Sequence, residues 1–106
     1  MRKWTDEKIY DWAKDTFGAH SPQAIAIRMN KEMAELLSAI ENHKLKEACA
    51  ELADLRVFMA QLNVILGAFA NDHREIYERV DEKMDINQKR EWEIAADGSH
   101  QHVEGT

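Results

Sequence analysis

The chain has 106 residues, a formal net charge of −6 and 44% hydrophobic residues, which fit a single domain. The acidic balance argues against a nucleic-acid backbone as the main partner, although a bound divalent cation would still allow a small anionic ligand. One cysteine allows no intrachain disulfide, the first residues lack the apolar core of a signal peptide, and the longest apolar run is residues 64–70. A membrane span needs about 20 residues, so we expect a soluble cytoplasmic protein.

Residue types with high helix propensity dominate the chain, and only one proline and four glycines interrupt them. Thr5 is a suitable N-cap and Gly18 a suitable terminator, which together predict a first helix over residues 5–16. Ser21 offers the next N-cap, so we expect a second helix over residues 22–41.

A third, long helix is expected over residues 44–70, after which Asn71 or Asp72 can cap a fourth helix. The fourth helix completes a predicted helical domain of residues 1–92. The remaining residues, 93–106, lack sustained periodicity, which predicts a loop or a loosely docked tail.

The short connection between the second and third helices predicts an antiparallel helical hairpin. Four helices joined by tight turns predict an all-α fold, a four-helix bundle. The third helix is apolar on more than one side, with Val57, Phe58, Val64 and Ile65 beside its main stripe. Because a helix that is hydrophobic all round is buried on several sides, we expect oligomerisation to complete the bundle, in a homodimer or homotetramer.

Two pairs of carboxylates stand three residues apart, Glu32 with Glu35 and Glu51 with Asp54. Residues at this spacing share a helix face, and an antiparallel hairpin lets the two pairs approach each other. Carboxylates that converge repel one another unless they are protonated, paired with basic groups or bound to a divalent cation. Oxygen ligands of this kind suit Mg²⁺, with Mn²⁺ as the alternative.

The helical projection places Glu32 on the flank of the apolar stripe of the second helix, and Glu51 beside the seam of the third. Acidic residues are common on helix surfaces, and Glu75 with Glu78 forms another pair at the same spacing. Spacing alone therefore leaves both a metal site and a solvated charged face open. The predicted stripe of the second helix consists of Ile25, Met29, Met33, Leu36, Leu37 and Ile40.

The segments "KEMAE" (31–35) and "ELAD" (51–54) resemble the Glu-Glu-x-x-Glu and Glu-x-x-Asp segments of the MazG-like, all-α nucleoside triphosphate pyrophosphohydrolases. Lys31 stands where that pattern has its leading Glu. "WAKDTFG" looks like the opening of the phage-type dATP/dGTP diphosphohydrolase branch. "KMDINQKREW" with "DGSHQHV" is similar to the ending of phage and bacterial MazG-like proteins, so the resemblance covers about residues 10–103.

The resemblance implies that Glu32, Glu35, Glu51 and Asp54 bind Mg²⁺ or Mn²⁺ and carry the catalysis. It implies hydrolysis of a nucleoside triphosphate between its α- and β-phosphates, which gives the monophosphate and pyrophosphate. Deoxynucleotides are the implied substrates, purines first, in control of the nucleotide pool. The expected general base is Glu32 or Glu35, and the sequence does not distinguish them.

Lys83, Asn87 and Arg90 follow one another at spacings of four and three residues, so they share one helix face. A solvated basic edge is the ordinary interpretation, whereas the resemblance implies that they bind triphosphate oxygens. Trp92 is a candidate for stacking on the base or for capping the core. Trp12 fits packing better, although at the site entrance it could contact base or ribose.

Two other functions stay open. A non-catalytic helical module that binds nucleotides or another protein would share this fold. A di-iron bundle is disfavoured because it requires Glu-x-x-His, and no histidine lies three residues after Glu32, Glu47 or Glu51. His100 and His102 have no further His or Cys cluster beside them, so a zinc site is not expected.

Overall fold

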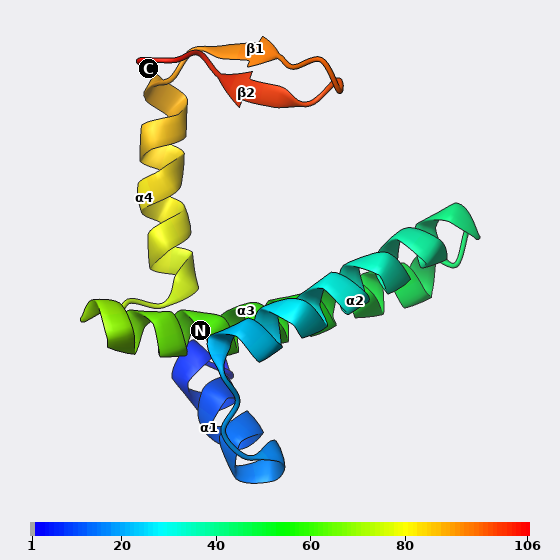
Figure 1. The fold of residues 1–106 in the computed structure, drawn as a ribbon, viewed down its shortest axis with the longest axis vertical. Helices are drawn as coiled ribbons and strands as arrows, with labels where there is room; N and C mark the ends of the chain where they lie inside the picture. The colour runs from blue at the N-terminus through cyan, green and yellow to red at the C-terminus, as the bar shows by residue number, and fades with distance from the viewer. Residues whose placement is uncertain (1) are drawn as a thin grey trace. The chain divides into compact units, whose positions relative to one another are not determined.

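The computed structural model describes residues 2–106, and these form four helices followed by two short strands (Figure 1). The predicted all-α class is confirmed. The chain divides into two compact units, one ending at Ile76 and the other comprising Tyr77–Thr106, and each is described by itself. The elements are α1 (Asp6–Phe17), α2 (Pro22–Glu41), α3 (Leu45–Ala70), α4 (Ile76–Lys89), β1 (Trp92–Ile94) and β2 (His100–His102).

The first two helices begin at the caps that the sequence predicts. The Thr5 hydroxyl accepts a hydrogen bond from the backbone N–H of Lys8, and the Ser21 hydroxyl accepts one from that of Ala24. Each bond satisfies a backbone donor that the first turn of a helix leaves unpaired. Gly18 ends α1 at φ 84°, in a region that a glycine adopts without steric cost.

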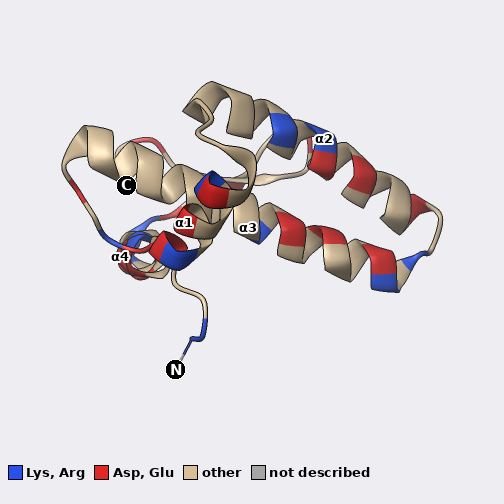
Figure 2. Ribbon diagram, turned by 90° about the horizontal axis from the view of Figure 1, so that it is seen from below, with Lys and Arg blue, Asp and Glu red and all other residues tan. Residues whose placement is uncertain are grey.

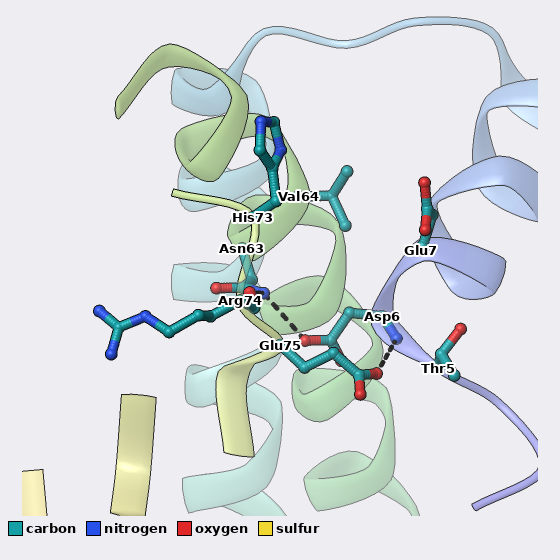
Figure 3. A pocket seen from close by; sticks show the side chains of 8 residues that line it. All are labelled: Thr5, Asp6, Glu7, Asn63, Val64, His73, Arg74 and Glu75. Atoms are coloured by element: carbon teal, nitrogen blue, oxygen red, sulfur yellow. Dashed lines mark hydrogen bonds between the residues drawn. The ribbon is translucent and has the colours of Figure 1, made fainter. Parts of the chain in front are cut away.

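The start of α4 differs from the prediction. Asn71 does not cap α4, because it ends α3 in the left-handed conformation at φ 52°. The first helical residue is Ile76, and its backbone N–H donates to the Asp6 carboxylate at 2.6 Å. The cap thus comes from α1, which no local reading of residues 71–75 could reveal. Figure 3 shows Asp6 and its neighbours lining a pocket of about 310 Å³.

Residues 93–106 form more than the predicted loop, because β1 and β2 pair as an antiparallel hairpin with Trp92 opposite His102. The connection contains Asp97, whose carboxylate accepts hydrogen bonds from the backbone and hydroxyl of Ser99, and Gly98 at φ 87°. Asp-Gly between extended segments is a strong hairpin signal. The division between the two compact units falls after Ile76, so this hairpin and most of α4 belong to the second unit.

In the first unit α2 and α3 run antiparallel side by side, as predicted, and α1 packs against α3 (Figure 1). The core between α2 and α3 is thin. Its apolar centre consists of Leu36, Ala39, Ala48 and Leu55, with Met29 partly buried against it. The predicted stripe of α2 is correct at Ile25, Met29 and Leu36, but Met33, Leu37 and Ile40 are exposed.

Within the described residues α3 is long and apolar enough to cross a membrane by length and composition, which the count of uninterrupted apolar residues did not predict. This property is weak evidence for a membrane span, since the core helix of a soluble protein also shows it. Here α3 packs against both α1 and α2, and its N-terminal half carries Glu51 and Asp54.

Candidate metal centre

The hairpin of α2 and α3 brings carboxylates from both helices together. Carboxylate oxygens of Glu32, Glu35 and Glu51 lie within 4.8 Å of one another. Figure 2 shows the acidic residues of the two helices arranged along the same hairpin. Three residues join the helices, and His43 adopts φ 57°, a left-handed conformation that helps the chain reverse direction.

Glu32 lies in the seam between the helices and not on its flank, which corrects the predicted stripe. Only 5% of Glu32 is exposed, whereas its neighbour Met33 is 51% exposed. The buried line of α2 runs through Ile25, Glu32, Leu36 and Ala39, at spacings of seven, four and three residues. This is helical periodicity, so a carboxylate occupies a position where the helix would otherwise place an apolar side chain.

The same holds on α3. Ala48 and Leu55 are buried in the seam, and the half-buried Glu51 lies between them at spacings of three and four. Glu32 and Glu51 therefore form an acidic layer inside an otherwise apolar interface. A buried carboxylate is costly unless it is paired, so this layer needs a specific partner.

The carboxylates of the layer perturb one another. A hydrogen bond between Glu51 and Glu32, burial and the charges of Glu32, Glu35 and Asp54 raise the pKa of Glu51 to about 7. The same hydrogen bond lowers the pKa of Glu32, as does Arg28, whose Nε donates to Glu32 Oε1 at 3.1 Å. The pKa of Glu35 is raised, mainly by Glu32. In the metal-free chain the cluster thus holds a proton near neutral pH.

The donor set fits a divalent cation. Glu51 Oε2 is buried and has no hydrogen-bond partner among the described residues. Its neighbours in the cluster are carboxylates, which are hard oxygen ligands suited to Mg²⁺ and Mn²⁺. Asp54 is exposed and outside the group of three, although its charge contributes to the raised pKa of Glu35 and Glu51. Lys31 is exposed as well, outside the cluster.

Two clefts adjoin the cluster. The first has a volume of about 260 Å³ and shares Glu35 and Glu51 with it; the second, of about 430 Å³, shares the Arg28 that pairs with Glu32. The remaining residues of the first cleft are Ser38, Ala39, Asn42, Lys44 and Glu47, and those of the second are Phe17, His20, Ala24, Ile25, Phe58 and Gln61.

Sequence reasoning missed the second cleft. Its clearest signal is Gln61, a polar residue that is 8% exposed on an apolar helix. Within the part of the chain that the structure describes, the Gln61 amide donates one hydrogen bond, a long one of 3.4 Å to a carbonyl of its own helix. Because this hydrogen bond is weak, the buried amide can donate one to a ligand instead. Phe17 and Phe58 provide apolar walls beside it.

Trp12 does not line either of these clefts. It is 48% exposed on α1, its ring meets that of Phe17 edge to face at 5.5 Å, and it borders a separate apolar cleft of about 520 Å³. That cleft is lined by Trp4, Ile9 and Val57 as well. This environment favours packing over contact with a polar ligand.

The predicted triphosphate-binding residues belong to the second unit. Lys83 and Asn87 lie on α4, one turn apart, and Arg90 follows the helix. The Asn87 carbonyl accepts a hydrogen bond from Trp92 Nε1 at 3.1 Å, and the Trp92 ring meets that of His102 edge to face. Arg90 Nε is buried without a hydrogen-bond partner among the described residues.

No family model matches the chain. A curated relative, the dATP/dGTP diphosphohydrolase of Salmonella phage PMBT28, is 32% identical over 95 residues, which make up 90% of this chain and 29% of that protein. The chain therefore spans less than a third of the relative's length. This identity supports the resemblance to the phage-type branch.

A solved structure shows the fold. The MazG-like pyrophosphohydrolase of cyanophage S-2L, bound to dGDP and three catalytic Mn²⁺ ions per active site, matches with a TM-score of 0.69 and 21% identity. The match covers 92% of this chain and 91% of that one. The predicted MazG-like architecture is therefore confirmed.

Proposed function

We propose that this chain, which has the MazG-like fold, is a metal-dependent nucleoside triphosphate pyrophosphohydrolase that acts on deoxynucleotides. One observation carries the proposal: an acidic layer in an apolar seam, in which the buried Glu51 Oε2 has no hydrogen-bond partner among residues 2–106. The relatives support the substrate class, since one is a dATP/dGTP diphosphohydrolase and the other binds dGDP. The products are the deoxynucleoside monophosphate and pyrophosphate, and purine deoxynucleotides are the first choice.

Glu32, Glu35 and Glu51 would hold Mg²⁺ or Mn²⁺, with the exposed Asp54 as a further ligand. When bound, the cation supplies charge stabilisation on the phosphates and activates water. Glu51 must first release its shared proton. Glu35 is the better general base, because it is exposed and its pKa is raised, whereas the pKa of Glu32 is lowered by Glu51 and Arg28.

The nucleoside fits the cleft beside Arg28. Phe17 and Phe58 can enclose a base, and the weakly bonded Gln61 amide can read its edge. This cleft reaches the acidic cluster through Arg28, so a nucleotide lying in it would bring its phosphates toward the cation. The assignment makes Gln61 the residue to change when base preference is tested.

Lys83, Asn87 and Arg90 remain our candidates for binding triphosphate oxygens, supported by their helical spacing and by the resemblance. The unpartnered Nε of Arg90 is consistent with an anionic ligand. Trp92 remains a candidate for contact with the base, and Trp12 would support the proposed base cleft through its edge-to-face contact with Phe17. The proposed catalytic domain therefore extends to residue 92.

A second copy of the chain would cover the apolar surface of the hairpin. Leu45, Leu52, Met59 and Leu66 follow one another at intervals of seven residues on α3, and their exposed fractions are 66%, 57%, 36% and 51%. A seven-residue apolar repeat is the pattern by which one helix packs on another. We expect a homodimer or homotetramer in the cytoplasm. A mass of one 12.3 kDa chain in gel filtration at micromolar concentration would contradict this.

The decisive experiment is pyrophosphate release from a panel of nucleoside and deoxynucleoside triphosphates with Mg²⁺. Glu51→Gln should lower the rate at least about hundredfold, because it removes a charged ligand while keeping the shape of the side chain. Glu41→Gln, an exposed position at the end of the same hairpin, is the matched control and should keep the native rate. Nucleotide binding without any release would instead show a non-catalytic module.

A further inference from the structure

The turn between α2 and α3 contributes one basic residue to the cleft of about 260 Å³ beside the cluster. That residue is Lys44, which lines the cleft together with Glu35 and Glu51 of the cluster. Lys44 is exposed and makes no ion pair among the described residues. A lysine next to several carboxylates would ordinarily form an ion pair with one of them. Because Lys44 forms no such pair within residues 2–106, its ammonium is available to a ligand.

This cleft lies at one side of the cluster along the hairpin axis. The cleft of about 430 Å³ that contains Phe17 and Phe58 lies at the other side. Lys44 precedes Glu51 by seven residues and Phe58 follows it by seven, so each lies about 10 Å from Glu51 along the axis of α3. The cluster is thus midway between an apolar, aromatic cleft and a polar cleft with a cation. This order matches the order of base, α-phosphate and terminal phosphates in a nucleotide.

We propose that Lys44 and its cleft bind the pyrophosphate leaving group, the β- and γ-phosphates of the substrate. The assignment rests on the function proposed above. In the reaction the water oxygen bonds to the α-phosphorus, and the bond from that phosphorus to the α–β bridging oxygen breaks. The electron pair of the broken bond leaves with pyrophosphate, and the proton of the water goes to a carboxylate of the cluster.

The Lys44 ammonium would then neutralise the charge that grows on the leaving group, as charge-assisted hydrogen bonds do for phosphates. Glu35 and Glu51 belong to both the cluster and the cleft, so a cation held by them would face the same phosphate oxygens. Lys44 is therefore a specificity residue, because a monophosphate has no group that reaches it.

The test measures binding of inorganic pyrophosphate to the full chain by calorimetry in the presence of Mg²⁺. Lys44→Ala should weaken pyrophosphate binding about tenfold, the effect of one charge-assisted hydrogen bond. Lys44→Arg should bind pyrophosphate within about threefold of the native chain, because it keeps the charge. Binding of a deoxynucleoside monophosphate should be unchanged in Lys44→Ala.

Lys46→Ala is the matched control, since Lys46 is an exposed lysine two residues away that does not line the cleft. An equal loss in Lys44→Ala and Lys46→Ala, or no pyrophosphate binding by the native chain, would overturn the assignment. The outcome is separable from that of the proposed function. Lys44-dependent pyrophosphate binding without hydrolysis defeats only the proposed function, and hydrolysis with unchanged pyrophosphate binding in Lys44→Ala defeats only this assignment.

Discussion

Among the described residues of the first unit, two carboxylates are buried, those of Asp6 and Glu32, and their surroundings differ. Asp6 is 4% exposed, and its Oδ2 accepts a hydrogen bond from Asn63 Nδ2 at 2.9 Å (Figure 3). The same oxygen accepts a second one from the Ile76 backbone at 2.6 Å. Glu32 is 5% exposed, but it faces Glu51, a second carboxylate with an unpartnered oxygen. The first carboxylate accepts from two N–H donors, whereas the second accepts from Arg28 Nε and also shares a hydrogen bond with another carboxylate.

The comparison separates a structural acid from a candidate ligand. A buried carboxylate that accepts from N–H groups stabilises the fold, because the donors replace the lost water. Carboxylates that face each other hold unfavourable energy until a proton or a cation joins them. Burial alone does not distinguish the two cases, whereas the identity of the neighbouring groups does.

Removal of Asp6 should produce the largest change in stability. Asp6→Ala should lower the free energy of unfolding by about 2–4 kcal/mol, because it leaves the Ile76 N–H without its acceptor and removes a partner of Asn63. The melting temperature should fall by about 10 °C or more, measured by circular dichroism. Asp11→Ala, at an exposed position of the same helix, should change it little. Equal losses in both variants would remove the distinction drawn for Asp6.

The acidic layer should make the stability of the chain depend on pH. The pKa of Glu51 is raised from 4.5 to about 7, so the folded chain holds this proton more tightly than the unfolded chain. The stabilisation of the folded chain by this proton is fully present below pH 4.5 and is lost as pH rises through 7. With a chelator present, the melting temperature should therefore fall between pH 5 and pH 8, and Mg²⁺ should restore it.

Glu51→Gln is the control for this pH dependence, because an amide cannot titrate. Between pH 5 and pH 8 the melting temperature of the variant should fall less than that of the native chain. Mg²⁺ should no longer raise the melting temperature of the variant. A native chain with the same pH profile as Glu51→Gln would show that the layer holds no proton.

The smallest effect is expected at Arg28, whose side chain is 58% exposed and therefore screened by solvent. Arg28→Gln removes a donor that orients Glu32, so Mg²⁺ affinity measured by calorimetry should change by about threefold. Lys31→Gln removes the same charge from an exposed site on the same helix. Matching changes in the two variants would mean that Arg28 acts only through net charge.

Local signals predicted much of the first unit. The caps at Thr5 and Ser21 and the short connection between α2 and α3 act within a few residues, so the sequence reveals them directly. The same connection allowed the two pairs of carboxylates to be placed near each other. Asp54, however, lies outside the group of three, because a helix turn carries it toward solvent.

Long-range and unusual features were harder to predict. The cap of α4 comes from Asp6, about seventy residues away in sequence. A stripe defined by apolar residues excludes Glu32 because it is charged, although helical periodicity places it in line with Leu36 and Ala39. An acidic residue at a position where the helical periodicity predicts a buried apolar one is the signal in the sequence that indicates this site. The Asp97–Gly98 turn was a second signal, obscured because its strands have only three residues each.

The three-residue turn between α2 and α3 also affects the order in which the protein can assemble. All the candidate ligands lie on two consecutive helices, so their contacts are local in sequence and can form quickly. During synthesis the hairpin is complete once residue 70 has left the ribosome. A cation could then bind before residues 71–106 exist, and so before the proposed triphosphate-binding residues of α4 have been made.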